Sequence, residues 1–202
     1  MPKNRYGITL IELIVALILM FIVVLGISSI DVFSHRQVIA AERRAKLQNE
    51  ATFLLEHMAK NIANATGNNN IVDQQVVNTT TITGGYDSSI QVHVAGADRI
   101  SGYYDSPNHW IAYAFINNSG IVNYCGNCSD AVCSSGCNSA WESAIASRIS
   151  GFAPAYDPVH SYIDMTVSTC WDITWAIGPC GGLNNPQINM TARLQMPSVS
   201  TN

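Results

Sequence analysis

The feature that most limits how this chain can fold is an apolar run near its amino terminus. From Ile8 to Ile30 the only charged side chain is that of Glu12. A helix of about 20 residues, each adding about 1.5 Å, crosses the hydrocarbon core of a membrane. The run therefore predicts a transmembrane helix over residues 8–30 that carries a carboxylate close to its start.

The carboxylate needs an explanation, because a charged group inside a bilayer costs at least about 2.5–3.5 kcal/mol on insertion scales. We therefore expect Glu12 to have a partner. A local alternative is a capping box, since Thr9 and Glu12 have the required spacing and the glutamate would satisfy backbone donors at the helix start. A second alternative is a removed signal peptide, because a basic start precedes the apolar run and the small residues Gly26 and Ser28 are spaced like a cleavage site.

The short basic leader ending in Gly7, the run ITLIE at residues 8–12 and the unbroken apolar helix resemble the type IV pilin-like family. This family comprises type IV pilins, minor pilins and the pseudopilins of type II secretion. The resemblance implies that a prepilin peptidase removes residues 1–7, that the new amino terminus at Ile8 is methylated and that Glu12 supports assembly. Two departures are that Ile8 stands where phenylalanine is commonest and that no proline interrupts the apolar run. The second favours a minor pilin or a pseudopilin.

The resemblance also implies partners and a location. Other pilins or pseudopilins would bind through the amino-terminal helix, and the chain would meet an inner-membrane assembly platform. Before assembly it would span the inner membrane once, with its head in the periplasm, and then enter a cell-surface pilus or a periplasmic pseudopilus. Basic residues flank the apolar run on both sides, so the positive-inside rule does not orient it.

Residues 31–66 predict an amphipathic continuation of the helix. No glycine or proline occurs from Arg36 to Ala65, and Thr66 and Gly67 begin a polar stretch that ends the pattern. Apolar residues recur at helical spacing of three or four, at Leu47, Ala51, Leu54, Met58 and Ile62. We expect this stripe to pack against the protein's own head.

Residues 67–202 predict a β-rich head. Apolar and polar residues alternate around Ile90–Val94, Ile163–Val167 and Ile188–Met196, and the runs 110–116 and 121–124 flank the turn sequence NNSG. Residues 171–177 predict a further strand, and residues 140–149 predict a short helix. The fold expected from these patterns is α+β, with a long amino-terminal helix packed on an antiparallel sheet.

Charge and motifs exclude two classes of function. From Gly67 onward the chain has three basic and nine acidic residues, a net charge of −6, which is unsuited to binding nucleic acid. None of the common catalytic or nucleotide-binding motifs occurs in the head, so we expect no enzyme, no catalytic residue and no cofactor. The scattered histidines and acidic residues do not have the spacing of a metal site; they are His93, His109, His160, Asp98, Asp105, Asp157 and Asp164.

The head has an even number of cysteines, at Cys125, Cys128, Cys133, Cys137, Cys170 and Cys180. The first four form CGNCSDAVCSSGC, which is also compatible with four thiolate ligands of zinc or of an iron–sulfur cluster. These spacings are more compact than in the usual paired CxxC sites, and an exported domain favours disulfides. We therefore expect three disulfides and no metal, with Cys170 bonded to Cys180 and the other four paired among themselves.

The leading hypothesis is a structural subunit, a minor pilin that initiates or caps a type IV pilus. The close alternative is a minor pseudopilin of a type II secretion system, since both use the same membrane segment. From another class, the chain could be a membrane-anchored adhesin or binding module that does not polymerise. In that case Glu12 would serve only as a helix cap.

Overall fold

The computed structural model describes residues 9–68, 76–79, 82, 86–94, 110–128, 133, 137, 141–174, 176–197 and 199–200. The chain divides into two compact units, Met1–Glu42 and Arg43–Asn202. One helix, α1 (Leu10–Ile62), begins in the first unit and ends in the second. The predicted boundary between the transmembrane segment (residues 8–30) and the amphipathic segment (residues 31–66) falls inside this helix and remains a prediction.

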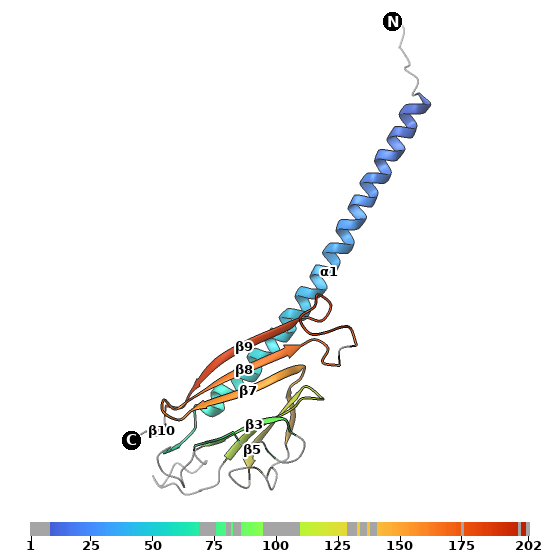
Figure 1. Ribbon diagram of the computed structural model, residues 1–202. Coiled ribbons are helices and arrows are strands. Elements are labelled where there is room, and N and C mark those ends of the chain that lie inside the picture. The colour runs from blue at the N-terminus through green and yellow to red at the C-terminus, as the bar shows by residue number, and fades with distance from the viewer. Residues whose placement is uncertain are drawn as a thin grey trace. The chain divides into compact units, whose positions relative to one another are not determined.

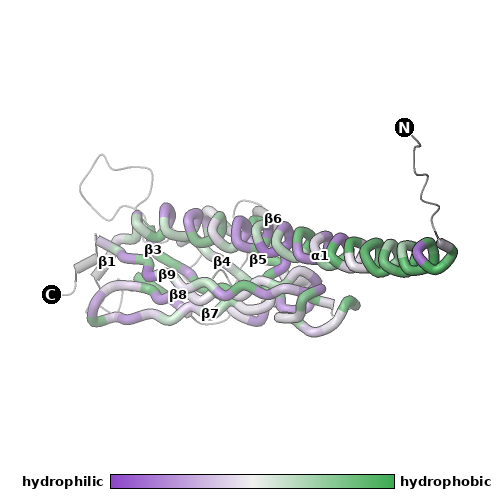
Figure 2. The backbone as a smooth tube through the Cα atoms, turned by 90° about the horizontal axis from the view of Figure 1, so that it is seen from above, coloured by the Kyte–Doolittle hydropathy of each residue, from purple (hydrophilic) through white to green (hydrophobic). Residues whose placement is uncertain are grey.

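In the first unit, α1 is mainly apolar. Its large hydrophobic side chains from Leu10 to Phe33 are all exposed, and Figure 2 shows that hydrophobic residues predominate in this half of the helix. Within the part of the chain that the structure describes, α1 is the one helix long and apolar enough to cross a membrane. Because water would surround these side chains in isolation, the segment requires a lipid or protein environment.

In the described residues of the second unit the helix is followed by ten strands in three sheets. Figure 1 labels several of these strands. A five-stranded antiparallel sheet has the order β2-β3-β4-β5-β6, and a three-stranded antiparallel sheet has the order β7-β8-β9. The short strands β1 and β10 pair in parallel. The strand bounds are β1 (Gly67–Asn68), β2 (Val77–Asn78), β3 (Ser88–His93), β4 (Trp110–Ile116), β5 (Ile121–Cys128), β6 (Glu142–Ala146), β7 (Ile149–Asp157), β8 (Tyr162–Cys170), β9 (Gln187–Gln195) and β10 (Val199–Ser200).

The core lies between the carboxyl-terminal part of α1 and the inner faces of the two larger sheets. The predicted stripe on the helix is completely buried there, at Leu47, Ala51, Leu54, Met58 and Ile62. Alternate residues of the strands complete the core, for example Ile111, Tyr113 and Phe115 of β4 and Ile163, Met165 and Val167 of β8. The α+β architecture expected from the sequence is therefore confirmed.

The opposite face of the five-stranded sheet carries a second, smaller core. It contains Trp110, Ala112 and Ala114 of β4 together with Ile82 and three cysteines. Strand β4 is thus buried on both faces, which explains why its sequence is apolar throughout instead of alternating. The predicted hairpin joins β4 to β5, and Gly120 in its turn adopts a φ of 63°, where a Cβ atom would collide with the Ile173 side chain.

Two expected elements are wrong. Residues 142–146 form strand β6 instead of a helix, because they pair with the edge of β5, Ala146 opposite Val122. Residues 171–177 were expected as a strand, but the described residues of this stretch form turns within the connection from β8 to β9. The carboxylate of Asp172 explains the turns, since it accepts hydrogen bonds from the backbone of Thr174 (3.0 Å) and Ile177 (3.1 Å).

Candidate functional site

The amino-terminal end of α1 is closed by a reciprocal capping box. The Oε2 atom of Glu12 accepts hydrogen bonds from the backbone N–H of Thr9 (2.8 Å) and from its hydroxyl (2.9 Å). The backbone N–H of Glu12 in turn lies 3.4 Å from the Thr9 hydroxyl oxygen. The local alternative considered from the sequence therefore exists in the single chain.

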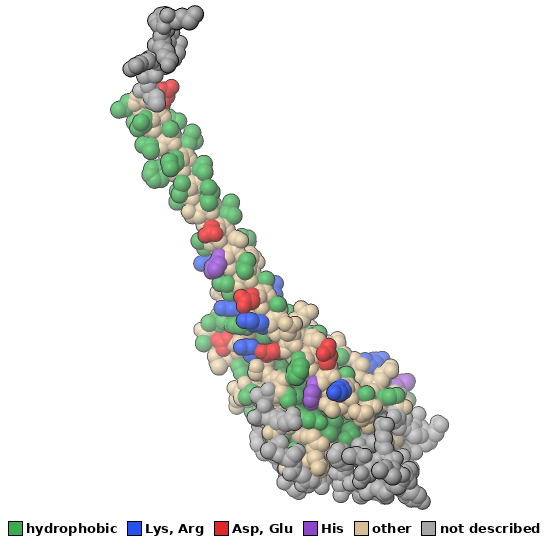
Figure 3. Space-filling view, turned by 180° about the vertical axis from the view of Figure 1, so that it is seen from behind, with side chains coloured by type: hydrophobic (Ala, Val, Ile, Leu, Met, Phe, Trp, Pro, Cys, Tyr) green, Lys and Arg blue, Asp and Glu red, His purple; other side chains and the backbone are tan. Residues whose placement is uncertain are grey.

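The capping contact occupies only one carboxylate oxygen. Among the residues that the structure describes, Oε1 of Glu12 accepts no hydrogen bond. Glu12 shares a shallow surface hollow with the apolar residues Ile11, Val15, Ala16 and Leu19. Figure 3 shows the hydrophobic side chains that cover this half of the helix. An acidic oxygen beside an exposed apolar surface is suited to accept a donor from a neighbouring molecule as that surface becomes covered.

The two residues predicted to be the sites of cleavage and methylation, Gly7 and Ile8, lie outside the described residues. Their roles in cleavage and methylation therefore remain predictions, as does the assembly role of Glu12.

The head contains a polar network that the sequence did not predict. The phenol oxygen of Tyr113, which is fully buried on β4, lies 3.0 Å from Nδ1 of His57 and 3.1 Å from Nδ2 of Asn61 on α1. The Asn61 amide also donates to the His57 carbonyl (2.9 Å). In the sequence, the only feature that could have indicated this network is the spacing of His57 and Asn61, which are one helical turn apart. These contacts fix the helix against the sheet.

A second unpredicted cluster joins α1 to the connection between β8 and β9. The side chains of Arg43, Lys46 and Arg148 lie over the ring of Trp171, with 5.3, 5.9 and 4.7 Å from the cationic group to the ring centroid. Arg148 also forms an ion pair with Glu50. Cation–π contacts of this kind attach the Trp171 segment to the helix.

The histidines and acidic residues considered from the sequence are held by local contacts where the structure describes them. Nδ1 of His93 lies 2.8 Å from the Thr66 carbonyl oxygen. The hydrogen bond from His160 to the Asp157 carboxylate (2.9 Å) is the main cause that lowers the pKa of Asp157 to about 2. His109, Asp98 and Asp105 lie outside the described residues.

Asp164 is engaged on the outer face of the three-stranded sheet. Arg193 donates two hydrogen bonds of 2.9 Å to its carboxylate, which lowers the pKa of Asp164. Asp157 and Asp164 are thus each bound to a basic partner.

The six cysteines lie in three disulfide pairs, Cys125–Cys137, Cys128–Cys133 and Cys170–Cys180, with Cα–Cα distances of 5.9, 5.1 and 5.8 Å. This agrees with the expected division into Cys170–Cys180 and a separate group of four. Sulfur atoms in disulfides are not the thiolates that zinc or an iron–sulfur cluster requires. In this oxidised form the group of four therefore offers no thiolate ligand.

Comparison with known proteins bears on the amino-terminal segment. Residues 2–28 match a family model described as the prokaryotic N-terminal methylation motif. No curated protein matches the chain, and no solved structure does. The matched segment includes Gly7, Ile8 and Glu12, the residues singled out above. With this motif, a long apolar amino-terminal helix and antiparallel sheets after it, the chain fits the type IV pilin-like family.

Proposed function

We propose that this chain is a non-enzymatic structural subunit of a type IV pilus, a minor pilin that initiates or caps the filament. The observation that carries the proposal is the methylation motif over residues 2–28, which overlaps the exposed apolar half of α1. The finer assignment to a minor subunit is supported by the apolar run without proline. Its partners are other pilins, a prepilin peptidase and an inner-membrane assembly platform.

Cleavage of the leader creates a positive charge at the new amino terminus, and this charge takes part in assembly. Cleavage after Gly7 leaves the amine of Ile8 as a positive amino terminus, and methylation of that amine preserves its charge. Within one subunit this amine is four residues from Glu12 along the chain. The Thr9 contacts survive the cleavage, because both groups of Thr9 that bind Oε2 belong to the mature chain.

The partner of Glu12 in the filament is the amine of a neighbouring subunit. Oε1 of the carboxylate is open to it, and the apolar residues around Glu12 exclude water once two helices pack together. An ion pair is stronger away from water, and removing one member of a buried pair is costly because it leaves the other charge uncompensated. Docking of a new subunit in this register therefore satisfies both charges, whereas other registers leave them unpaired.

Glu12→Gln and Thr9→Val separate this role from the capping role. Glu12→Gln keeps the size of the side chain and removes its charge, whereas Thr9→Val keeps the charge and removes the hydroxyl donor. We expect the Gln variant to insert, to be processed and to fold its head, but to fail in restoring pili to a strain that lacks the gene. The Val variant should restore them.

The readouts are electron microscopy of surface filaments and immunoblots of membrane and sheared fractions at native expression level. Normal piliation by Glu12→Gln, together with loss of piliation by Thr9→Val, would show that the cap is the essential element and would overturn the assembly role.

Processing itself has a direct test. Mass spectrometry of protein from its own host should find an amino-terminal peptide that begins with N-methylated Ile8. A mature terminus near Ser28 would indicate a removed signal peptide and would exclude a filament subunit anchored by this helix.

The close alternative is a minor pseudopilin of a type II secretion system, since the same motif serves both systems. Deletion of the gene separates the two. Loss of surface pili with normal secretion supports the pilus, and retained pili with exoproteins trapped in the periplasm support the pseudopilus. A membrane-anchored adhesin that does not polymerise would tolerate Glu12→Gln in an adhesion assay.

A further inference from the structure

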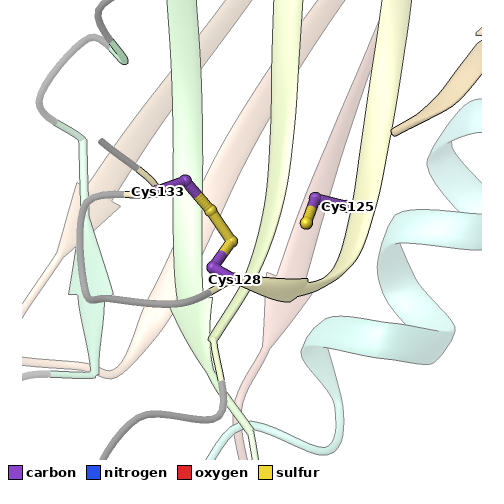
Figure 4. Close-up of side chains that lie close together, drawn as sticks. All are labelled: Cys125, Cys128 and Cys133. Carbon is purple, nitrogen blue, oxygen red and sulfur yellow. A yellow bond between two sulfur atoms is a disulfide. The ribbon is translucent and has the colours of Figure 1, made fainter. Parts of the chain in front are cut away.

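Two disulfides lie against each other at the end of strand β5. The sulfur atoms of Cys125, Cys128 and Cys133 are all within 4.8 Å of one another. Cys125 is bonded to Cys137, and Cys128 is bonded to Cys133. Figure 4 shows the sulfur of Cys125 beside the Cys128–Cys133 bridge. Each bridge is therefore within reach of a sulfur that belongs to the other.

An irregularity in the sheet produces this arrangement. Along a regular strand, residues three apart point to opposite faces. Cys128 pairs with Trp110 and Cys125 pairs with Ala112, so three steps along β5 correspond to two steps along β4. This β-bulge turns both cysteines of the CxxC sequence into the second core of the head.

The four sulfur atoms differ in access. Cys125, Cys128 and Cys133 are at most 1% exposed, whereas Cys137 is only partly buried. Thiol–disulfide exchange begins with attack of a thiolate on an accessible sulfur, and the other sulfur of the bond leaves as a thiolate. An external thiol will therefore attack Cys137 and release Cys125, the sulfur that adjoins the second bridge.

We propose that this four-cysteine cluster is a thiol-exchange site, at which a small thiol binds covalently to Cys137 and converts the two disulfides into Cys125–Cys128 and Cys133–Cys137. The thiolate of the small molecule attacks the Cys137 sulfur, which breaks the Cys125–Cys137 bond and leaves a mixed disulfide. The Cys125 thiolate then attacks Cys128 and breaks the Cys128–Cys133 bond.

The third step closes the cycle. The Cys133 thiolate attacks Cys137 in the mixed disulfide, forms Cys133–Cys137 and expels the small thiolate. The number of disulfides is the same at the end as at the start, and the thiol is regenerated. The conversion therefore needs neither an oxidant nor a net reductant, only a catalytic thiol.

Glutathione is a suitable probe. The full chain in detergent micelles is incubated at pH 8 with a mixture of reduced and oxidised glutathione, quenched with acid, alkylated and mapped by peptide mass spectrometry without reduction. We expect glutathione on Cys137 at early times and the Cys125–Cys128 and Cys133–Cys137 pairs later. Cys180 is partly buried like Cys137, but the group of close sulfurs contains neither Cys170 nor Cys180, so this bridge serves as the internal control and should return to the same pair after any exchange.

Two single variants test the order of the steps without any added thiol. Cys137→Ser leaves a thiol on Cys125, within 4.8 Å of both sulfurs of the remaining bridge. Cys125→Ser is the comparison variant. It leaves the thiol on Cys137, which can also exchange with Cys133 but lies outside that group of three sulfurs, so we expect its reaction to be slower. Proximity predicts about tenfold or more rearranged disulfide in Cys137→Ser than in Cys125→Ser.

Two results would overturn the proposal. They are retention of only the original pairs in glutathione, and an intact Cys128–Cys133 bridge with a free Cys125 in Cys137→Ser. If a variant does not fold, as judged by circular dichroism, the glutathione experiment on the unaltered chain decides alone.

Discussion

The burial of neighbouring residues on α1 allows a sharp test of how the helix is held to the head. Leu54 is 0% exposed and lies in the main core, whereas the adjacent Phe53 is 55% exposed and has a ring contact with His57. Both residues lie outside the predicted membrane segment. Their replacement by alanine therefore changes the packing of the head without changing the anchor.

The expected costs differ by several fold. Leu54→Ala removes three buried carbon atoms, worth about 2.4 kcal/mol at about 0.8 kcal/mol each, and leaves a cavity that adds to the cost. We expect a loss of about 3–4 kcal/mol in the free energy of unfolding. For a domain of this size that corresponds to a fall in Tm of about 6–16 °C. Phe53→Ala should cost less than about 1 kcal/mol.

Tryptophan fluorescence isolates the relevant transition. The four tryptophans all lie between residues 110 and 175, so the signal reports on the head and not on the apolar half of α1. Thermal unfolding of the full chain in detergent micelles, without reductant, gives Tm for both variants and the unaltered protein. Equal shifts for Leu54→Ala and Phe53→Ala would refute the burial of the stripe against the sheets.

Three further results are expected. Tyr113→Phe should lower the stability of the head by about 0.5–1.5 kcal/mol in the same assay, because it removes the hydrogen bonds of a buried phenol to the partly buried His57 and Asn61. Asn185→Ala should cost about 2–4 kcal/mol, because the side chain is 1% exposed and makes three hydrogen bonds to the backbone of its loop, whereas Asn189→Ala on the exposed face of β9 should have almost no effect. The pKa of Asp157 is lowered from 3.8 to about 2, so the stability it contributes is present above pH 4 and is lost as the pH falls toward 2; His160→Ala should raise this pKa, as measured by NMR titration.

The sequence was most informative where one physical requirement dominated. The stripe from Leu47 to Ile62 has helical spacing because one face of a helix must be covered, and all five of its residues are fully buried. The hairpin at residues 117–120 was predictable because its turn needs a residue with positive φ, which Gly120 supplies. In both cases local chemistry and tertiary packing favour the same structure.

The errors arose where tertiary contacts outweighed local preference. Residues 142–146 have helix-forming side chains but complete the edge of β5. The stretch that starts at Trp171 is mostly apolar like a strand, yet the Trp171 ring contacts Arg43 on α1 and the following residues form turns set by Asp172. Strand β7 includes Pro154, which is tolerated because β7 is at the edge of its sheet and one side needs no backbone donor.

The candidate site was predictable only in part, for a physical reason. The capping box at Thr9 and Glu12 follows from two residues three positions apart, and the single chain contains it. A partner on another molecule leaves no trace in the fold of one chain beyond an open Oε1 and an uncovered surface. The β-bulge that brings Cys125 and Cys128 to one face depends on the register of β4, which the spacing CxxC does not specify.

The two halves of α1 therefore meet opposite requirements along one helix. Beyond Arg43 a single apolar stripe is buried by the head, so folding of the chain itself satisfies it. Between Leu10 and Phe33 the large hydrophobic side chains are all exposed, so only lipid or neighbouring helices can cover them. A change such as Leu54→Ala should thus weaken folding and spare docking, whereas Glu12→Gln should spare folding and prevent docking. If Glu12→Gln lowered the Tm of the head as much as Leu54→Ala does, the two functions would not be separable, and its effect on filaments could not be assigned to the contact between subunits.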